Sequence, residues 1–168
     1  MKLHTTRFGT VDVEESEIYT FPNGLPGFEW MRSFVLLQPD PNVPISFLQS
    51  VEEAEIAFIM TSPFLFYPEY EFELNDGEKR ELSIEREEDV EVHCIMTVRD
   101  ELETATLNLL APVVLNKSER IGKQLILAGT SYHTKHPLKS VSGSGSDDGQ
   151  VSEEHSEAET VRETKEVP

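Results

Sequence analysis

Apolar and polar residues alternate over residues 90–98 and again over residues 104–115. A period of two places every second side chain on one face of a strand, so both segments are predicted to be half-buried strands. The apolar positions of the first segment are Val90, Val92, Cys94, Met96 and Val98. Those of the second are Ala105, Leu107, Leu109 and Ala111.

Short apolar runs bounded by Pro, Gly, Asn or Glu predict further strands at residues 34–37, 45–48, 56–60 and 124–127. Proline interrupts any long helix, because it lacks the backbone N–H and clashes with the preceding turn. Eight of the ten prolines lie at turns: Pro22, Pro26, Pro39, Pro41, Pro44, Pro63, Pro68 and Pro112. Short helical turns are expected around residues 28–32, 50–53 and 78–82. The predicted fold is an all-β, antiparallel barrel-like or sandwich-like domain.

The composition changes near Ser140. Residues 140–168 are rich in Ser, Gly and Glu and contain no aromatic side chain. Such a segment buries too little apolar surface to offset the entropy lost on ordering. We therefore expect a β domain over residues 1–139 and a disordered acidic tail over residues 140–168.

The chain has 32 acidic and 14 basic residues and a formal charge of −18. Eight acids and two bases give the tail −6, which leaves −12 on residues 1–139. A negative field of this strength repels nucleic acid and anionic membranes and attracts basic proteins. The chain also lacks the apolar run of about 7 to 15 residues that opens a signal peptide, and a membrane span of about 20 apolar residues. These features predict a cytoplasmic protein.

No motif identifies an enzyme. The glycines of residues 143–149 do not have the dinucleotide-binding spacing, and no nucleophile elbow or phosphate loop occurs. His133 and His136 lack an obvious third metal ligand, and the carboxylates of residues 85–91 lack the glycine of a calcium loop. Cys94 is the only cysteine and is expected to be a buried thiol. We expect no catalytic residue, no cofactor and no metal.

Residues 69–74 alternate between Glu and apolar side chains. As a strand, this segment would place Glu69, Glu71 and Glu73 on one face about 6.5–7 Å apart and the other three toward the core. The acids would either keep an edge strand from self-pairing or form an acidic stripe for Lys or Arg of a partner.

Four large apolar residues lie between Pro63 and Pro68, either in a buried turn or in a partly exposed patch that marks an interface. Trp30 and Met31 are expected to belong to the core or its cover. The candidate interface residues are Phe64, Phe66, Tyr67, Glu69, Tyr70, Glu71 and Glu73.

Three blocks of residues resemble the bacterial flagellar assembly factor FliW family, and the resemblance covers about residues 1–138. The first block comprises residues 21–29, with Asn23-Gly24 and Pro26-Gly27, and residues 34–37. The second comprises residues 47–50, 57–59 and Pro63; the third comprises residues 106–116 with Arg120, Gly122, Gln124, Ile126, Leu127 and Tyr132. Pro68-Glu69-Tyr70 and the acidic tail depart from the family pattern.

The resemblance implies a non-enzymatic regulator that is a monomer on its own. FliW-type proteins bind CsrA, a basic RNA-binding translational repressor, and also bind flagellin, whose terminal segments form amphipathic helices in the filament. Partner switching then couples flagellin translation to secretion. An alternative function is an acidic nucleic-acid mimic that competes directly for the basic RNA-binding groove.

Overall fold

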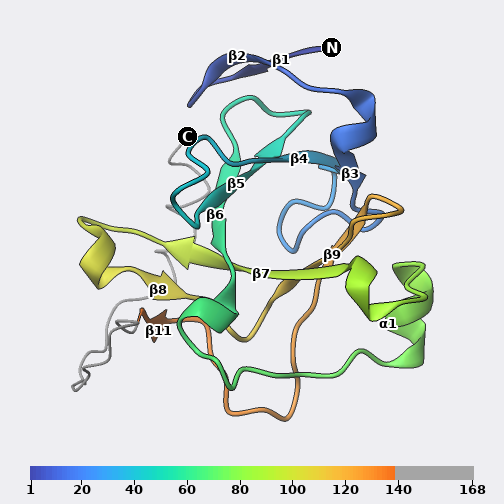
Figure 1. Cartoon of the computed structure of the whole chain (residues 1–168), viewed down its shortest axis with the longest axis vertical. Coiled ribbons are helices and arrows are strands. Elements are labelled where there is room, and N and C mark those ends of the chain that lie inside the picture. Colours follow the sequence, from blue (N-terminus) through green and yellow to red (C-terminus); the bar gives the residue numbers. More distant parts are fainter. Residues whose placement is uncertain (139–168) are drawn as a thin grey trace.

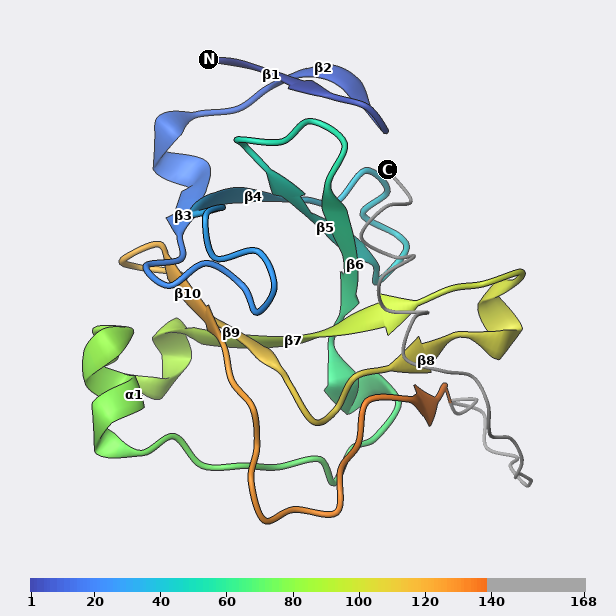
Figure 2. The same cartoon turned by 180° about the vertical axis from the view of Figure 1, so that it is seen from behind.

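The computed structural model describes residues 1–138, and of Leu102 only the backbone. Seven strands close a barrel in the order β3-β4-β5-β6-β7-β9-β10, in which β7 pairs directly with β9 (Figure 1; Figure 2). Neighbouring strands are antiparallel except β10 and β3, which are parallel. The barrel strands are β3 (Ile18–Thr20), β4 (Ser33–Leu37), β5 (Ser46–Ser50), β6 (Ala57–Thr61), β7 (Val90–Thr97), β9 (Val113–Asn116) and β10 (Ile121–Gln124).

The other four strands lie outside the closed barrel. The hairpin of β1 (Lys2–Thr5) and β2 (Gly9–Asp12) packs Leu3 and Val13 against Val35 of β4. The strands β8 (Thr106–Leu107) and β11 (His136–Pro137) extend the sheet beyond one end of β7. The helical elements are α1 (Asp76–Glu81) and the 3₁₀ turns η1 (Glu15–Glu17), η2 (Pro63–Leu65), η3 (Glu87–Asp89) and η4 (Leu102–Thr104).

Strand β7 separates two hydrophobic cores. Ile95 packs with Phe34 and the other buried residues inside the barrel. Its neighbours Cys94 and Met96 belong to a second cluster, together with Tyr70 and residues of the β8 segment. Successive side chains of a strand point to opposite faces, so the alternating pattern of residues 90–98 serves both cores.

The second core is covered by two long connections and not by a sheet. The segment that leads from η2 to α1 and the segment after β10 run across the same end of the molecule (Figure 1; Figure 2). Phe72 of the first connection and Leu127 of the second pack against this core. The ends of these two segments form the candidate site described below.

The predicted fold class is confirmed, while several local boundaries differ. Helix α1 matches the helical turn expected at residues 78–82, whereas residues 28–32 and 50–53 form turns without a helix. The segment 104–115 divides into β8 and β9, because residues 108–112 leave the ladder and Asn108 Oδ1 accepts the N–H of Ala111. Residues 140–168, the expected tail, lie outside the described residues.

Candidate protein-interaction site

The segment 69–74 is not a strand, so its prediction as a strand was wrong; it begins in a turn, where Tyr70 N–H donates to Tyr67 O at 2.9 Å. It is not paired with another strand, and Glu71 N–H donates instead to the Tyr132 hydroxyl at 3.2 Å. The alternation itself is confirmed: Glu69, Glu71 and Glu73 are exposed, and Phe72 is partly buried. Side-chain anchors therefore hold this segment where a strand would use a backbone ladder.

Tyr70 is the central anchor of the segment. Its side chain is only 4% exposed, and its hydroxyl donates to Leu109 O at 2.7 Å. Burial, and then the adjacent Cys94 thiol, raise the pKa of Tyr70. The expectation that Tyr70 contacts a partner directly is therefore corrected, because this ring supports the surface from beneath. Burial likewise raises the pKa of Cys94 to about 12, as expected for a buried thiol.

The apolar residues between the two prolines divide into an outward pair and an inward pair. Phe64 and Leu65 on η2 are 44% and 43% exposed. Phe66 and Tyr67 are partly buried against the second core. The Tyr67 hydroxyl donates to Pro137 O, and burial raises the pKa of Tyr67 to about 12. The exposure of Phe64 and Leu65 excludes a turn that buries all four residues, while the use of this patch as an interface stays a prediction.

The structure adds residues that the interface prediction did not include. Tyr132, His133 and His136 come from the second connection, and the ring of His136 meets Tyr67 edge-on at 5.6 Å between centroids. The two imidazoles stack at 3.8 Å, and His136 Nε2 accepts the N–H of His133. The sequence signal was present, since Tyr132 belongs to the third family-like block. No pattern in the sequence around Tyr132 indicates that it lies near Tyr67 in the fold.

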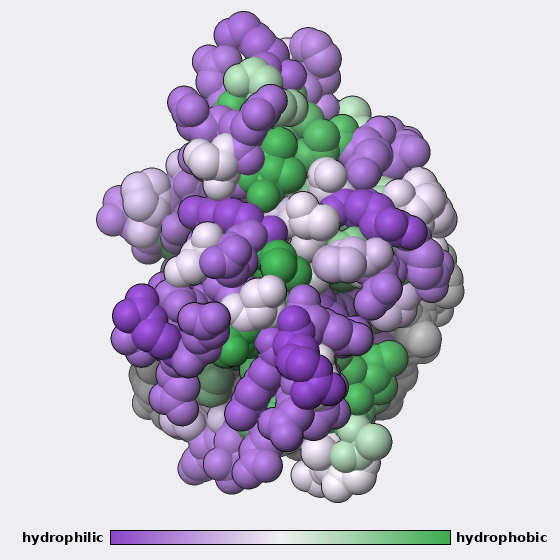
Figure 3. Space-filling view, turned by 90° about the vertical axis from the view of Figure 1, so that its right-hand side faces the viewer, coloured by the Kyte–Doolittle hydropathy of each residue, from purple (hydrophilic) through white to green (hydrophobic). Residues whose placement is uncertain are grey.

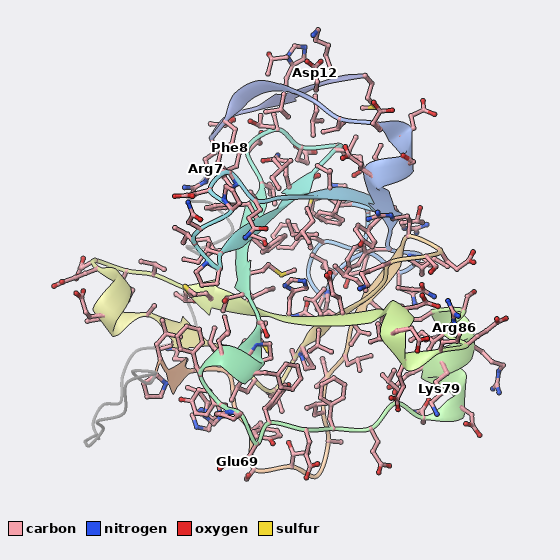
Figure 4. The ribbon with its side chains drawn as sticks, in the orientation of Figure 1. Arg7, Phe8, Asp12, Glu69, Lys79 and Arg86 are labelled. Carbon is pink, nitrogen blue, oxygen red and sulfur yellow. The ribbon has the colours of Figure 1, made fainter. Side chains whose placement is uncertain are left out.

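The acids of this site are not neutralised locally. Glu69, Glu71 and Glu73 take part in no salt bridge within residues 1–138. The side chain of Glu69 projects from the end of the molecule opposite to Asp12 on the N-terminal hairpin (Figure 4). Hydrophilic residues also cover most of the face over α1 (Figure 3). This end therefore combines unpaired negative charge with the exposed side chains of Phe64 and Leu65.

A hollow in the surface of the barrel is lined by acids and bases together, among them Glu91 and Arg120. The Arg120 guanidinium lies 4.8 Å from the centre of the Tyr19 ring. Glu91 Oε1 and His93 Nε2 are 3.2 Å apart, and this hydrogen bond lowers the pKa of Glu91. Because both signs of charge line this hollow, it matches a strongly basic partner less well than Glu69 and its neighbours do.

Two further features bear on the class of site. Within residues 1–138, no three His, Cys, Asp or Glu side chains are grouped as metal ligands. No helix in that range is long and apolar enough to cross a membrane.

Trp30 is 58% exposed and Met31 is buried, so the expectation that both belong to the core or cover holds only for Met31.

Comparison with known proteins gives consistent matches. The family model of the FliW protein matches residues 2–138. A flagellar assembly factor FliW from Desulfitobacterium hafniense (strain Y51) is 47% identical over 138 residues, which are 82% of this chain and 91% of that protein. The corresponding protein of Bacillus subtilis (strain 168) is 40% identical, over 82% of this chain and 96% of its own length.

One solved structure has a similar fold. The crystal structure of a flagellar assembly factor FliW aligns with a TM-score of 0.79 at 40% sequence identity, over 83% of this chain and 98% of that chain. Residues 139–168 lie beyond the part that the family model matches.

Proposed function

The chain belongs to the FliW family of flagellar assembly factors, and we propose that it acts by binding two proteins in turn. One partner is a CsrA-type translational repressor and the other is flagellin. Newly made flagellin binds the chain, so the repressor remains free to repress translation of flagellin mRNA. Export of flagellin then frees the chain to capture and inhibit the repressor. No chemical step is needed, and we propose that the chain is not an enzyme.

The observation that carries this proposal is the adjacency of unpaired acids and exposed apolar side chains at one end of the molecule. Glu69 lies one residue from Tyr70, whose ring is 5.9 Å from that of Phe64 between centroids. An RNA-binding repressor needs a basic surface, which exposed carboxylates attract and orient. The terminal segments of flagellin form amphipathic helices, whose apolar faces suit Phe64 and Leu65.

The proposed partners also suggest where in the cell the chain acts. Both the repressor and newly translated flagellin are met in the cytoplasm, so we propose a cytoplasmic location. The net charge argues in the same direction, because a chain of −18 is repelled by nucleic acid and by anionic membrane surfaces.

A pull-down from a motile bacterium tests the proposal. The full chain is used as bait, and bound proteins are identified by mass spectrometry in cells with and without flagellin export. We expect flagellin when export is blocked and the CsrA-type repressor when export proceeds. Recovery of neither protein under either condition would contradict the proposed function.

The second candidate function is a nucleic-acid mimic, which is favoured by three exposed carboxylates at alternate positions of one segment. Such a mimic would occupy the RNA-binding groove of the repressor itself. Increasing RNA would then raise the apparent Kd of the chain linearly and without limit. A regulator that binds elsewhere on the repressor would instead lower RNA affinity only to a limiting value.

A further inference from the structure

The rings at the candidate site form one connected cluster, in which Phe64 and His133 are exposed and Tyr67, Tyr132 and His136 are partly buried. The ring of Tyr70 contacts Phe64 on one side and Tyr132 on the other, at centroid distances of 5.9 and 4.7 Å. His136 continues the surface from Tyr132 and meets Tyr67 at 5.6 Å. We call Phe64, Tyr67, Tyr132, His133 and His136 the ring surface; Tyr70 is its buried support.

The carboxylates lie at the border of the ring surface. Glu69 and Glu71 flank Tyr70 in the chain, and Glu71 N–H donates to the hydroxyl of Tyr132. Both acids are exposed and, within the described part of the chain, neither forms a salt bridge. The contact between the Glu71 backbone and Tyr132 therefore brings the acidic segment and the rings to one part of the surface.

We propose that the ring surface, with its bordering Glu69 and Glu71, recognises arginine in preference to lysine on a basic partner. This inference rests on the proposed function, because it names the side chain by which the basic partner is held. A guanidinium is planar and weakly hydrated, so it stacks on a ring while its N–H groups donate to a carboxylate. A lysine ammonium is a compact, strongly hydrated charge that the carboxylates attract without gaining the stacking contact.

Phe64 is the ring that the preference depends on most. It is the most exposed of the phenylalanine and tyrosine rings at this site, and it lies on η2, directly before the acids. Stacking at an exposed site corresponds to about a two- to fivefold gain in affinity. The carboxylates strengthen the binding of arginine and lysine alike, so the rings and the acids have separable effects.

Two peptides test the inference on the full chain. Acetyl-(Arg-Ala)4-amide and acetyl-(Lys-Ala)4-amide have equal charge, and their basic side chains recur at the same alternate spacing as the acids. We expect the arginine peptide to bind about two- to fivefold more tightly in NMR titrations at low ionic strength, with shifts at Phe64 and Tyr132. Glu71→Gln should weaken both peptides and leave their ratio unchanged.

Substitution of one ring at a time completes the test. Phe64→Leu keeps an apolar side chain and removes the ring, so the two peptides should then bind with equal affinity. Trp30→Leu removes an exposed ring from a different segment than that of Glu69 and Glu71, and it should leave the preference intact. Equal binding by the unsubstituted chain, or a preference that survives Phe64→Leu, overturns the inference. Binding of the repressor itself is measured separately, so a chain that prefers arginine but does not bind the repressor would contradict only the proposed function.

Discussion

The side-chain amide of Asn116 donates a hydrogen bond to the main-chain oxygen of Leu82 at 2.8 Å. Asn116 ends β9, whereas Leu82 directly follows α1, so one buried side chain joins two distant parts of the chain. The same nitrogen donates to Ser83 O at 3.0 Å, where the backbone has a φ of 55°. On its other side, Asn116 Oδ1 accepts the N–H groups of Ser118 and Glu119 in the β9–β10 turn.

Asn116→Ala should lower the free energy of unfolding by about 2–4 kcal/mol, because it leaves buried carbonyl groups without a donor. Urea denaturation followed by circular dichroism measures this change. Asn42→Ala, at an exposed position, should change stability by less than about 0.5 kcal/mol. A loss below about 1 kcal/mol for Asn116→Ala would show that water satisfies these carbonyls.

Gly122→Ala should destabilise the barrel by about 1–3 kcal/mol through overpacking. A Cβ at this position would lie 2.4 Å from Cζ of Phe21 and 2.8 Å from Cδ2 of Leu115. Gly77→Ala is the matched control, since a Cβ there would meet only the side chains of Asn75 and Arg80, at 3.4 and 3.9 Å. That substitution should stabilise by about 0.5–1 kcal/mol. Thermal unfolding of the two variants should therefore shift in opposite directions.

Reversal of Glu69, Glu71 and Glu73 to Lys should weaken binding of a CsrA-type protein by about tenfold at low ionic strength. The salt dependence should also flatten, because fewer charge pairs remain to be screened. Asp100, Glu101 and Glu103 are exposed acids of the β7–β8 connection, and their reversal changes the net charge equally. Equal weakening by both triple variants would assign the effect to net charge and not to the site.

Stability should fall as the pH rises from about 10 to about 12, because burial raises the pKa of Tyr67 to about 12 in the folded chain. The unfolded chain loses this proton near pH 10, so the contribution of Tyr67 is fully present below pH 10 and is lost as the pH passes 12. Tyr67→Phe should reduce the proton release on unfolding by about one in this window. Urea titrations at pH 9, 10 and 11 measure it, and an unchanged pH dependence would contradict the assignment.

Deletion of residues 140–168 should leave the β domain folded. The described elements end with β11, and Leu138 N–H donates to Ala105 O at 3.3 Å. We expect a single cooperative unfolding transition with a midpoint close to that of the full chain. Loss of cooperativity would place the domain boundary later than residue 139.

Much of the candidate site was visible in local sequence. The alternation of residues 69–74 identified Glu69 and Glu71 as exposed and Tyr70 as inward-facing, because side-chain direction in an extended segment depends only on its own backbone. The absence of a strand there was not predictable, since a ladder needs a second strand alongside. The inward direction of Tyr70 was therefore predicted correctly. The prediction that Tyr70 contacts a partner directly was not, because its burial depends on the segments that pack around it.

The sequence by itself determined the fold class, the barrel strands β4 to β7 and β9, and the excess of negative charge, because periodicity, proline placement and composition act locally or over the whole chain. Only the tertiary structure brought Tyr132 and His136 beside Tyr67 and placed Asn116 under Leu82. These contacts join residues more than 30 positions apart, and they depend on how the barrel closes and where its long connections cross. The sequence pattern of one segment does not indicate which distant segment packs against it.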